Sequence, residues 1–190
     1  MTRGKNEAIT LEGIRTLLHY VGEDPARDGL QDTPNRVLRA FLEMTSGYSK
    51  TAEDALSTEF SEKHDEMVVV TKLRFSSLCE HHLLPFVGHV TFGYIPDGKV
   101  VGLSKIPRLV EVYSKRLQIQ ERMTDQIAGG FWRVASPKGV GVIVTAQHQC
   151  MSCRGVKQQD AEMVTSSLLG QFMEGNTRAE FLQYHRGTHG

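Results

Sequence analysis

Residues 67–95 read MVVVTKLRFSSLCEHHLLPFVGHVTFGYI, and this stretch decides the fold. Its two ends, 67–70 and 87–95, are rich in β-branched and aromatic residues, a composition that is typical of β-strands. Between them stands CEHH at 79–82, whose side chains can bind metal ions or carry protons. We therefore predict two strands that flank a chemically active segment.

This segment contains two candidate ligands of a metal ion. Cys79 and His82 stand at positions i and i+3, so both can face one point from a single turn. Thiolate and imidazole are usual protein ligands of Zn²⁺, and a distant third ligand such as Cys150 leaves one tetrahedral position free for water. We predict an open, catalytic zinc site. Taken alone, Cys79 and His82 would fit a buried cysteine beside a histidine equally well.

A closed structural site is the competing hypothesis. Cys150 and Cys153 form a Cys-x-x-Cys pair that could join the two ligands of the CEHH segment in a Cys₃His cluster, which does no chemistry. Against it, His148 stands two residues before Cys150, and on an extended strand the two side chains would share a face. A catalytic metal site needs a proton donor beside its ligands, and His148 would stand there. We therefore favour the catalytic site.

Length and composition limit the class of protein. A chain of 190 residues fits one domain with a small appendage. Its 22 basic and 22 acidic residues balance, so no overall charge favours nucleic acid or an anionic membrane. Three cysteines suit a reducing compartment, and we find no apolar run of membrane-spanning length and no signal core at the N-terminus. We expect a cytoplasmic protein that binds neither nucleic acid nor membrane.

The pattern of the sequence changes near residue 66. Before it, apolar residues recur at helical spacing over 9–21 and again from Pro34, where Thr33 is expected to cap the helix. After it we predict a turn at 97–98, helices over 105–117 and 121–135, strands over 140–146 and 163–172, and a last helix over 177–185. The predicted organisation is a helical N-terminal arm, 1–65, and a catalytic domain, 66–190.

Several motifs together resemble the GTP cyclohydrolase I family. They are DGL at 28–30, TPNRV at 33–37, CEHH at 79–82, GLSK at 102–105 followed by Arg108, QIQER at 118–122 and HQCMSCRG at 148–155. The resemblance implies an α+β tunnelling fold, a β-β-α-α-β-β unit with an antiparallel sheet and helices on one face. It also implies a ring-shaped homodecamer that converts GTP and water to formate and 7,8-dihydroneopterin triphosphate, the first step of tetrahydrofolate and pterin biosynthesis.

The resemblance assigns the metal ligands and the acid. Cys79, His82 and Cys150 would bind Zn²⁺, whose bound water would attack C8 of the guanine ring. His148 would protonate N7 of that ring, and His81 would order the water or move protons. Either histidine could instead only orient a metal ligand through a hydrogen bond, and for His81 the two alternatives stand level.

Substrate-binding residues are implied in the same way. Glu121 would accept both N1–H and the exocyclic amino group of guanine, a pair of donors that adenine lacks. Gln120 would add a contact to the base. An acidic residue at a helix start is also favoured by the helix dipole alone, so Glu121 has a structural alternative.

The triphosphate would lie in a cluster of basic side chains. Lys105 and Arg108 stand at i and i+3 on a predicted helix, and Arg154 follows Cys150 by four residues. Ser104 would help the later sugar rearrangement, or would simply cap the helix. Two other functions stay open: a non-catalytic nucleotide-binding module with structural zinc, and another purine enzyme of the tunnelling fold. No regulatory protein partner can be named from the sequence.

Overall fold

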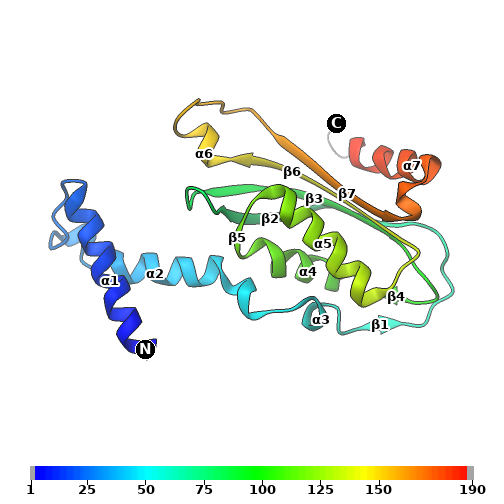
Figure 1. Ribbon diagram of the computed structural model, residues 1–190, viewed down its shortest axis with the longest axis horizontal. Helices are drawn as coiled ribbons and strands as arrows, with labels where there is room; N and C mark the ends of the chain where they lie inside the picture. Colours follow the sequence, from blue (N-terminus) through cyan, green and yellow to red (C-terminus); the bar gives the residue numbers. More distant parts are fainter. Residues whose placement is uncertain (1–2, 188–190) are drawn as a thin grey trace. The chain divides into compact units, whose positions relative to one another are not determined.

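The computed structural model describes residues 3–187, which form two compact units, one that ends at Thr45 and one that begins at Ser46 (Figure 1). In chain order the elements are α1 (Arg3–Tyr20), η1 (Asp28–Leu30), α2 (Thr33–Met44), η2 (Ser46–Ser49), α3 (Ala52–Ala55), β1 (Glu59–Phe60), β2 (Val68–Cys79), β3 (Pro85–Ile95), β4 (Val100–Val101), α4 (Lys105–Ser114), β5 (Leu117–Gln118), α5 (Gln120–Ala135), β6 (Gly139–His148), α6 (Gln149–Ser152), β7 (Met163–Gly170), η3 (Gln171–Met173) and α7 (Gly175–Arg186).

The N-terminal unit contains the two predicted helices, α1 and α2. The predicted cap is wrong by one residue, because α2 begins at Thr33 and Asp32 occupies the cap position. Asp32 does not cap the backbone with its side chain. Its carboxylate accepts hydrogen bonds from Asn35 and from Arg36 instead, so the first turn is stabilised through side chains.

Five strands form the main sheet, in the order β5-β2-β3-β6-β7. Every pair is antiparallel except the short pairing of β2 with β5. The large elements follow each other as β2, β3, α4, α5, β6 and β7, which confirms the predicted β-β-α-α-β-β order. The short strand β4 follows the turn that the sequence predicted at 97–98. The strand β5 was not predicted: the helix predicted over 105–117 ends at Ser114, and β5 begins at Leu117.

Two strands have different bounds from those predicted. β2 is much longer than 67–70, because its pairing with β3 continues as far as Leu78, with buried and exposed positions alternating over 72–77. β7 ends at Gly170 and not at 172. Gly170 has a φ of 58°, and a Cβ atom there would lie 2.4 Å from the carbonyl oxygen of Lys138, so only glycine fits this end of the strand.

Helices α4 and α5 pack on one face of the sheet and bury the main core. Fully buried side chains such as Phe92, Leu109 and Phe131 each contribute about 1.5–3 kcal/mol by leaving water. Gly130 allows the two helices to approach, because a Cβ atom there would lie 2.4 Å from the Tyr113 hydroxyl oxygen. Packing therefore requires a glycine at position 130, inside α5.

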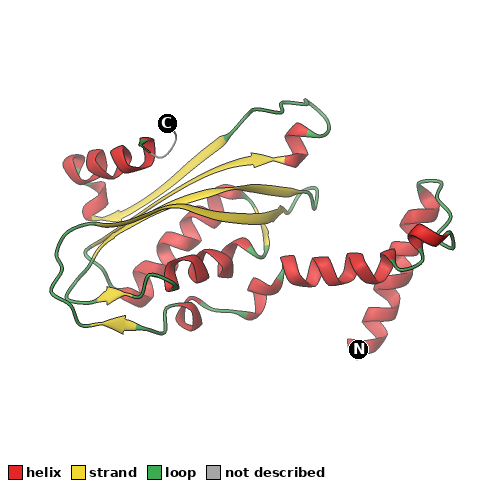
Figure 2. Ribbon diagram, turned by 180° about the vertical axis from the view of Figure 1, so that it is seen from behind, coloured by secondary structure: helices red, strands yellow, loops and turns green. Residues whose placement is uncertain are grey.

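The other face of the sheet is partly covered by α7 and η3, as both ribbon views show (Figure 2). Along β6, Val142 and Val144 belong to the main core, whereas the intervening Ile143 packs with Phe172 and Phe181. Helices on one face were predicted, and this holds for α4 and α5. The second face differs from the prediction, because η3 and α7 also pack on it.

Residues 46–65 pack with the sheet unit. Ala52 and Leu56 are buried in the main core, and β1 pairs with β4. The compact units therefore divide at 45/46, whereas the functional division into an arm, 1–65, and a catalytic domain, 66–190, stays a prediction. No helix in the described part of the chain is long and apolar enough to span a membrane.

Candidate metal centre and active site

The longest hairpin of the sheet ends at the CEHH segment. Cys79 is the last residue of β2, and a tight turn follows it. The Leu83 N–H donates to the Cys79 carbonyl at 2.8 Å, and the Cys79 N–H donates to the Leu84 carbonyl at 2.9 Å. The turn brings Nδ1 of His82 to 4.0 Å from Sγ of Cys79, as the i, i+3 spacing predicted.

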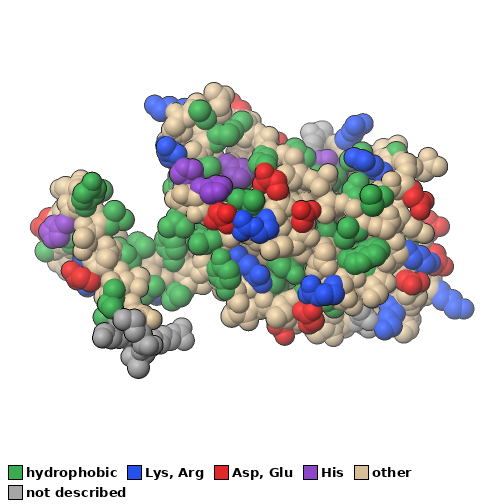
Figure 3. All heavy atoms as spheres, in the orientation of Figure 1, with side chains coloured by type: hydrophobic (Ala, Val, Ile, Leu, Met, Phe, Trp, Pro, Cys, Tyr) green, Lys and Arg blue, Asp and Glu red, His purple; other side chains and the backbone are tan. Residues whose placement is uncertain are grey.

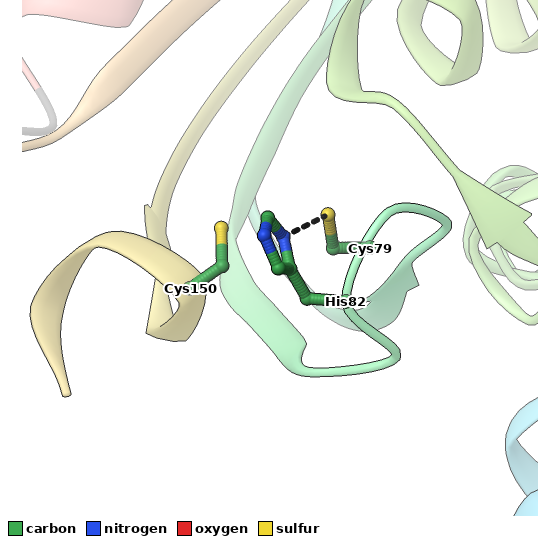
Figure 4. Close-up of side chains that lie close together, drawn as sticks. All are labelled: Cys79, His82 and Cys150. Carbon is green, nitrogen blue, oxygen red and sulfur yellow. Dashed lines mark hydrogen bonds between the residues drawn. The ribbon is translucent and has the colours of Figure 1, made fainter. Parts of the chain in front are cut away.

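Cys150 comes to the same place from a segment that is distant in the sequence. It lies on α6, directly after β6, and its thiol faces Cys79 and His82 (Figure 4). The ligand atoms of these three residues all lie within 4.8 Å of one another. The sequence therefore identified a group that can hold a metal ion.

The argument that placed His148 and Cys150 on one strand is wrong. β6 ends at His148, which pairs with Phe86, and the chain then turns into α6. The next position on the partner strand is Pro85, which has no N–H with which to continue the ladder. Cys150 reaches the cluster from a short helix and not from an extended strand.

The donor set fits a divalent cation. A Zn–S bond of about 2.3 Å and a Zn–N bond of about 2.0 Å together reach ~4.3 Å, so one ion can bridge Cys79 and His82. Burial raises the pKa of the Cys150 thiol, and the neighbouring Cys79 raises it further. Metal uptake must then displace a thiol proton, and a cation would offset the cost of two adjacent thiolates.

Cys153 lies outside this cluster. Its side chain is exposed, and its thiol donates to the Gln149 carbonyl at 2.9 Å. Among the described residues, the only group of metal-binding side chains is Cys79, His82 and Cys150. Three protein ligands leave part of the coordination sphere open, which favours the catalytic hypothesis over the closed Cys₃His site.

His148 is held beside the cluster by two neighbours. Its ring stacks on Phe86 with centroids 4.6 Å apart and planes 2° from parallel, and its Nε2 lies 2.9 Å from Oε1 of Gln120. Burial lowers the pKa of His148, and the charge of Glu121 opposes this shift. The ring is thus held in a fixed plane beside the cluster, with the Glu121 charge favouring its protonated form, an arrangement that a proton donor can use.

Glu121 and His81 are more accessible. Glu121 is exposed in the first turn of α5, and within the described residues its carboxylate has no hydrogen bond or ion pair. The side chain of His81 is 64% exposed, and its Nδ1 lies 3.9 Å from Sγ of Cys79. Figure 3 shows histidine side chains gathered on this surface beside acidic and basic ones. A free carboxylate and an exposed imidazole are thus available to a ligand.

Comparisons with known proteins agree with this site. The family model described as GTP cyclohydrolase I matches residues 10–186. A protein named GTP cyclohydrolase 1 from Synechococcus sp. (strain JA-2-3B'a(2-13)) is 52% identical over 95% of this chain and 80% of its own. Its namesakes from Gloeobacter violaceus and Alkalilimnicola ehrlichii are 49% and 50% identical, over 94% and 90% of this chain and 85% and 94% of their own. The chain belongs to the GTP cyclohydrolase I family.

Membership of the GTP cyclohydrolase I family agrees with the observed fold. The α+β unit with its curled, largely antiparallel sheet is consistent with the tunnelling fold that the sequence predicted. Among solved structures, the apo form of the archaeosine synthase QueF-Like is 19% identical and aligns with a TM-score of 0.45 over 55% of this chain and 93% of that chain.

Three residues expected in the active site of a GTP cyclohydrolase I lie away from the metal group in this chain. Ser104 precedes α4, and Lys105 and Arg108 lie in its first turns. The other end of α4 leads into β5, which pairs with Cys79, and the 10 residues of the helix span about 15 Å (Figure 1). Lys105 contacts Ser57 instead, and Ser104 makes no side-chain cap. The predicted roles of Lys105, Arg108 and Ser104 in substrate binding and catalysis stay predictions.

Two further predicted residues lie near the metal group. Arg154 follows α6, and its positive charge lowers the pKa of Cys150, although burial outweighs this effect. Gln120 is 1% exposed, and its amide is fully engaged with the protein, in contrast to the predicted contact with the base. The predicted roles of Arg154 in phosphate binding and of Gln120 in base binding stay predictions.

Sequence reasoning missed an ion pair that joins the two halves of the site. Both carboxylate oxygens of Glu80 accept hydrogen bonds from Arg122, at 2.7 and 2.8 Å, in a bidentate arrangement. Arg122 accordingly holds the pKa of Glu80 below its usual range. The only signal in the sequence was position, because each residue adjoins a predicted site residue. The pair ties the metal-binding turn to the start of α5, where Glu121 lies.

We expect Arg122→Met to weaken metal binding by about 10-fold, within the range found when partners of metal-binding segments are removed. A competition titration with a chelator would measure it. Arg133→Met is the control, because it breaks another arginine–glutamate ion pair of α5, with Glu53, which contains no residue next to a metal ligand. Equal metal affinities in the two variants would show that the Glu80–Arg122 pair does not hold the metal-binding turn.

Proposed function

We propose that this protein opens the imidazole ring of GTP by hydrolysis at C8, releases formate and forms 7,8-dihydroneopterin triphosphate. One observation carries the proposal: Cys79, His82 and Cys150 converge next to a half-buried His148, in a chain of the GTP cyclohydrolase I family. This arrangement supports an open metal position and a proton donor at one place. Hydrolysis of a purine ring needs both.

The metal that we propose is Zn²⁺, since two thiols and an imidazole are typical of its three-ligand sites. When bound, it would lower the pKa of a water molecule to about 7 and so supply a nucleophile at neutral pH. His81 is exposed beside Cys79, a position from which it would orient that water through a hydrogen bond.

His148 would donate the proton that the guanine ring needs at N7. Stacking on Phe86 and the bond to Gln120 fix the plane and the direction of its ring. This fixed placement of the ring favours proton transfer over simple support of a ligand.

Base recognition would come from Glu121. Its carboxylate is free and exposed at the start of α5, and its charge acts on His148, so the two side chains lie near each other. A base held by Glu121 would therefore have its imidazole ring close to the proposed acid. The free carboxylate can accept both adjacent donors of guanine.

We infer that the triphosphate site is shared between copies of the chain. Lys105, Arg108 and Ser104 begin α4, one helix length from the metal group. We therefore propose a homo-oligomer in which a neighbouring copy supplies these residues, and the family resemblance suggests a decamer. Arg154 would contribute from the same chain as the metal ligands.

The decisive experiment is an assay of formate release from GTP by the zinc-loaded protein. Stoichiometric formate and a pteridine absorbance are expected. A protein that binds zinc and GTP and yet releases no formate would instead be a non-catalytic module with a structural metal. Formate without the pteridine would indicate another purine enzyme of the tunnelling fold.

Mixed oligomers test the shared site. We expect His148→Ala and Lys105→Ala to be inactive alone, and their co-expressed mixture to recover on the order of a quarter of the wild-type activity by random pairing of copies. The recovery arises because an intact His148 from one copy meets an intact Lys105 from another. A mixture as inactive as its parents would show that each site is built within one chain.

Glu121→Gln tests base recognition. The amide keeps the shape but turns an NH₂ group towards a guanine donor, so GTP binding should weaken by about 1 to 3 kcal/mol while zinc is retained. Competition of ATP against GTP, titrated on both proteins, measures the preference for guanine. If the variant prefers GTP as strongly as the wild type does, another residue recognises the base.

A further inference from the structure

The side-chain amide of Gln120 has a single possible orientation. Its nitrogen lies 3.0 Å from the Val144 carbonyl oxygen, 2.9 Å from the Met163 carbonyl oxygen and 3.1 Å from the Thr165 hydroxyl. Backbone carbonyls only accept hydrogen bonds, so the NH₂ group must face them. A flipped amide would set its oxygen against two acceptors in a site that is 1% exposed.

This orientation decides which ring nitrogen of His148 carries hydrogen. With its NH₂ group directed at the carbonyls, Gln120 presents Oε1 to Nε2 of His148 at 2.9 Å. An amide oxygen cannot donate, so Nε2 must be the donor of this bond. Nδ1 is then the nitrogen left with a free lone pair in the neutral ring, and no partner for it is found within the described residues.

We propose that Gln120 is a positioning residue that keeps Nε2 of His148 protonated, so that Nδ1 is the nitrogen that exchanges a proton with the substrate. The second half of this statement rests on the proposed function. In the step itself, the Nδ1–H bond of the imidazolium breaks and an N7–H bond forms on the purine. His148 is left as the neutral tautomer that Gln120 stabilises.

The surrounding contacts support positioning and not contact with the base. Both hydrogens of the Gln120 amide are used by the main chain of β6 and β7, and its oxygen is used by His148. The Thr124 hydroxyl donates to the main-chain carbonyl of Gln120 or bonds the Thr165 hydroxyl, at 2.7 Å each, and Thr165 in turn accepts from the Gln120 amide, so the amide belongs to a connected network. Its orientation is therefore set before any substrate arrives.

Nitrogen-15 spectra of histidine-labelled, zinc-loaded protein test the tautomer directly, at a pH where the ring is neutral. The His148 signals are identified by their absence in His148→Asn. We expect hydrogen on Nε2 alone in the wild type and a mixture of the two tautomers in Gln120→Met. Hydrogen on Nδ1 of His148 in the wild type would overturn the inference.

Kinetics supply the second readout. Gln120→Met should lower kcat by about 10- to 100-fold, the effect found when a hydrogen-bond partner that orients a metal-binding histidine is removed, with KM for GTP and zinc content nearly unchanged. Gln118→Met is the matched control: Gln118 is 2% exposed and also buries its amide, but it bonds Tyr113 and Gln126 and not His148. The control should keep the wild-type tautomer and kcat.

The outcomes separate this inference from the proposed function. If Gln120→Met and Gln118→Met have the same His148 tautomer and the same kcat, Gln120 only stabilises the fold. A wild-type protein that releases no formate would refute the function, while the spectra would still decide whether Gln120 sets the tautomer.

Discussion

Cys79→Ser, His82→Ala and Cys150→Ser should each abolish stoichiometric zinc binding and formate release together. Each change removes one of three ligand atoms that lie within 4.8 Å of one another. Two remaining ligands hold zinc poorly. The loss of zinc affinity should therefore be larger than the roughly 10- to 100-fold loss that follows when only a hydrogen-bond partner of a ligand is changed. Zinc content by elemental analysis and formate release from the same samples provide the measurement.

Cys153→Ser is the control for this series, because Cys153 is exposed and lies outside the metal group. It should keep both zinc and activity. If Cys153→Ser lost its zinc as the ligand variants do, the closed Cys₃His cluster would be correct and the open site would have to be abandoned.

The second large effect is expected for His148→Ala, which should lose about 10² to 10⁴ in turnover while it keeps zinc and affinity for GTP. The reason is that His148 lies beside the metal group without being one of its three ligands. Single-turnover rates with GTP, together with equilibrium binding of GTP, separate chemistry from affinity.

The neighbouring exposed histidine provides a comparison. His81→Ala should show a smaller loss, because its side chain is 64% exposed and is not fixed by a stacked ring or a buried amide. An unchanged rate in His148→Ala, beside a lost rate in His81→Ala, would transfer the role of proton donor to His81.

Much of the metal group could be predicted from the sequence, because the relevant geometry is local. Cys79 and His82 stand three positions apart, and any tight turn at that point brings both side chains to one side. The major helices and strands were predictable for the same reason, since hydrophobic periodicity reflects which face of an element is buried. The predicted ends of these elements were wrong where a contact with a distant residue decides them, as at Gly170, which lies against Lys138.

The rest of the site depends on contacts between residues far apart in the chain. Gln120 meets His148 because α5 packs on β6 and β7, and no spacing within the sequence shows that its amide is buried there. The bidentate pair of Glu80 and Arg122 likewise joins residues that are distant in the chain, on a turn and on a helix. Such contacts are set by strand register and helix packing, which single-residue patterns do not encode.

By itself, the sequence determined the kinds of element, the candidate ligands and the family, because these follow from residue types and their local spacing. Only the tertiary structure decided that Cys150 comes to the metal group from a helix, that Gln120 fixes His148, and that Lys105 begins a helix whose far end leads to the metal group. The physical reason is the register between β3 and β6. It pairs Phe86 with His148 and so brings the end of one strand to the turn that carries the other two ligands.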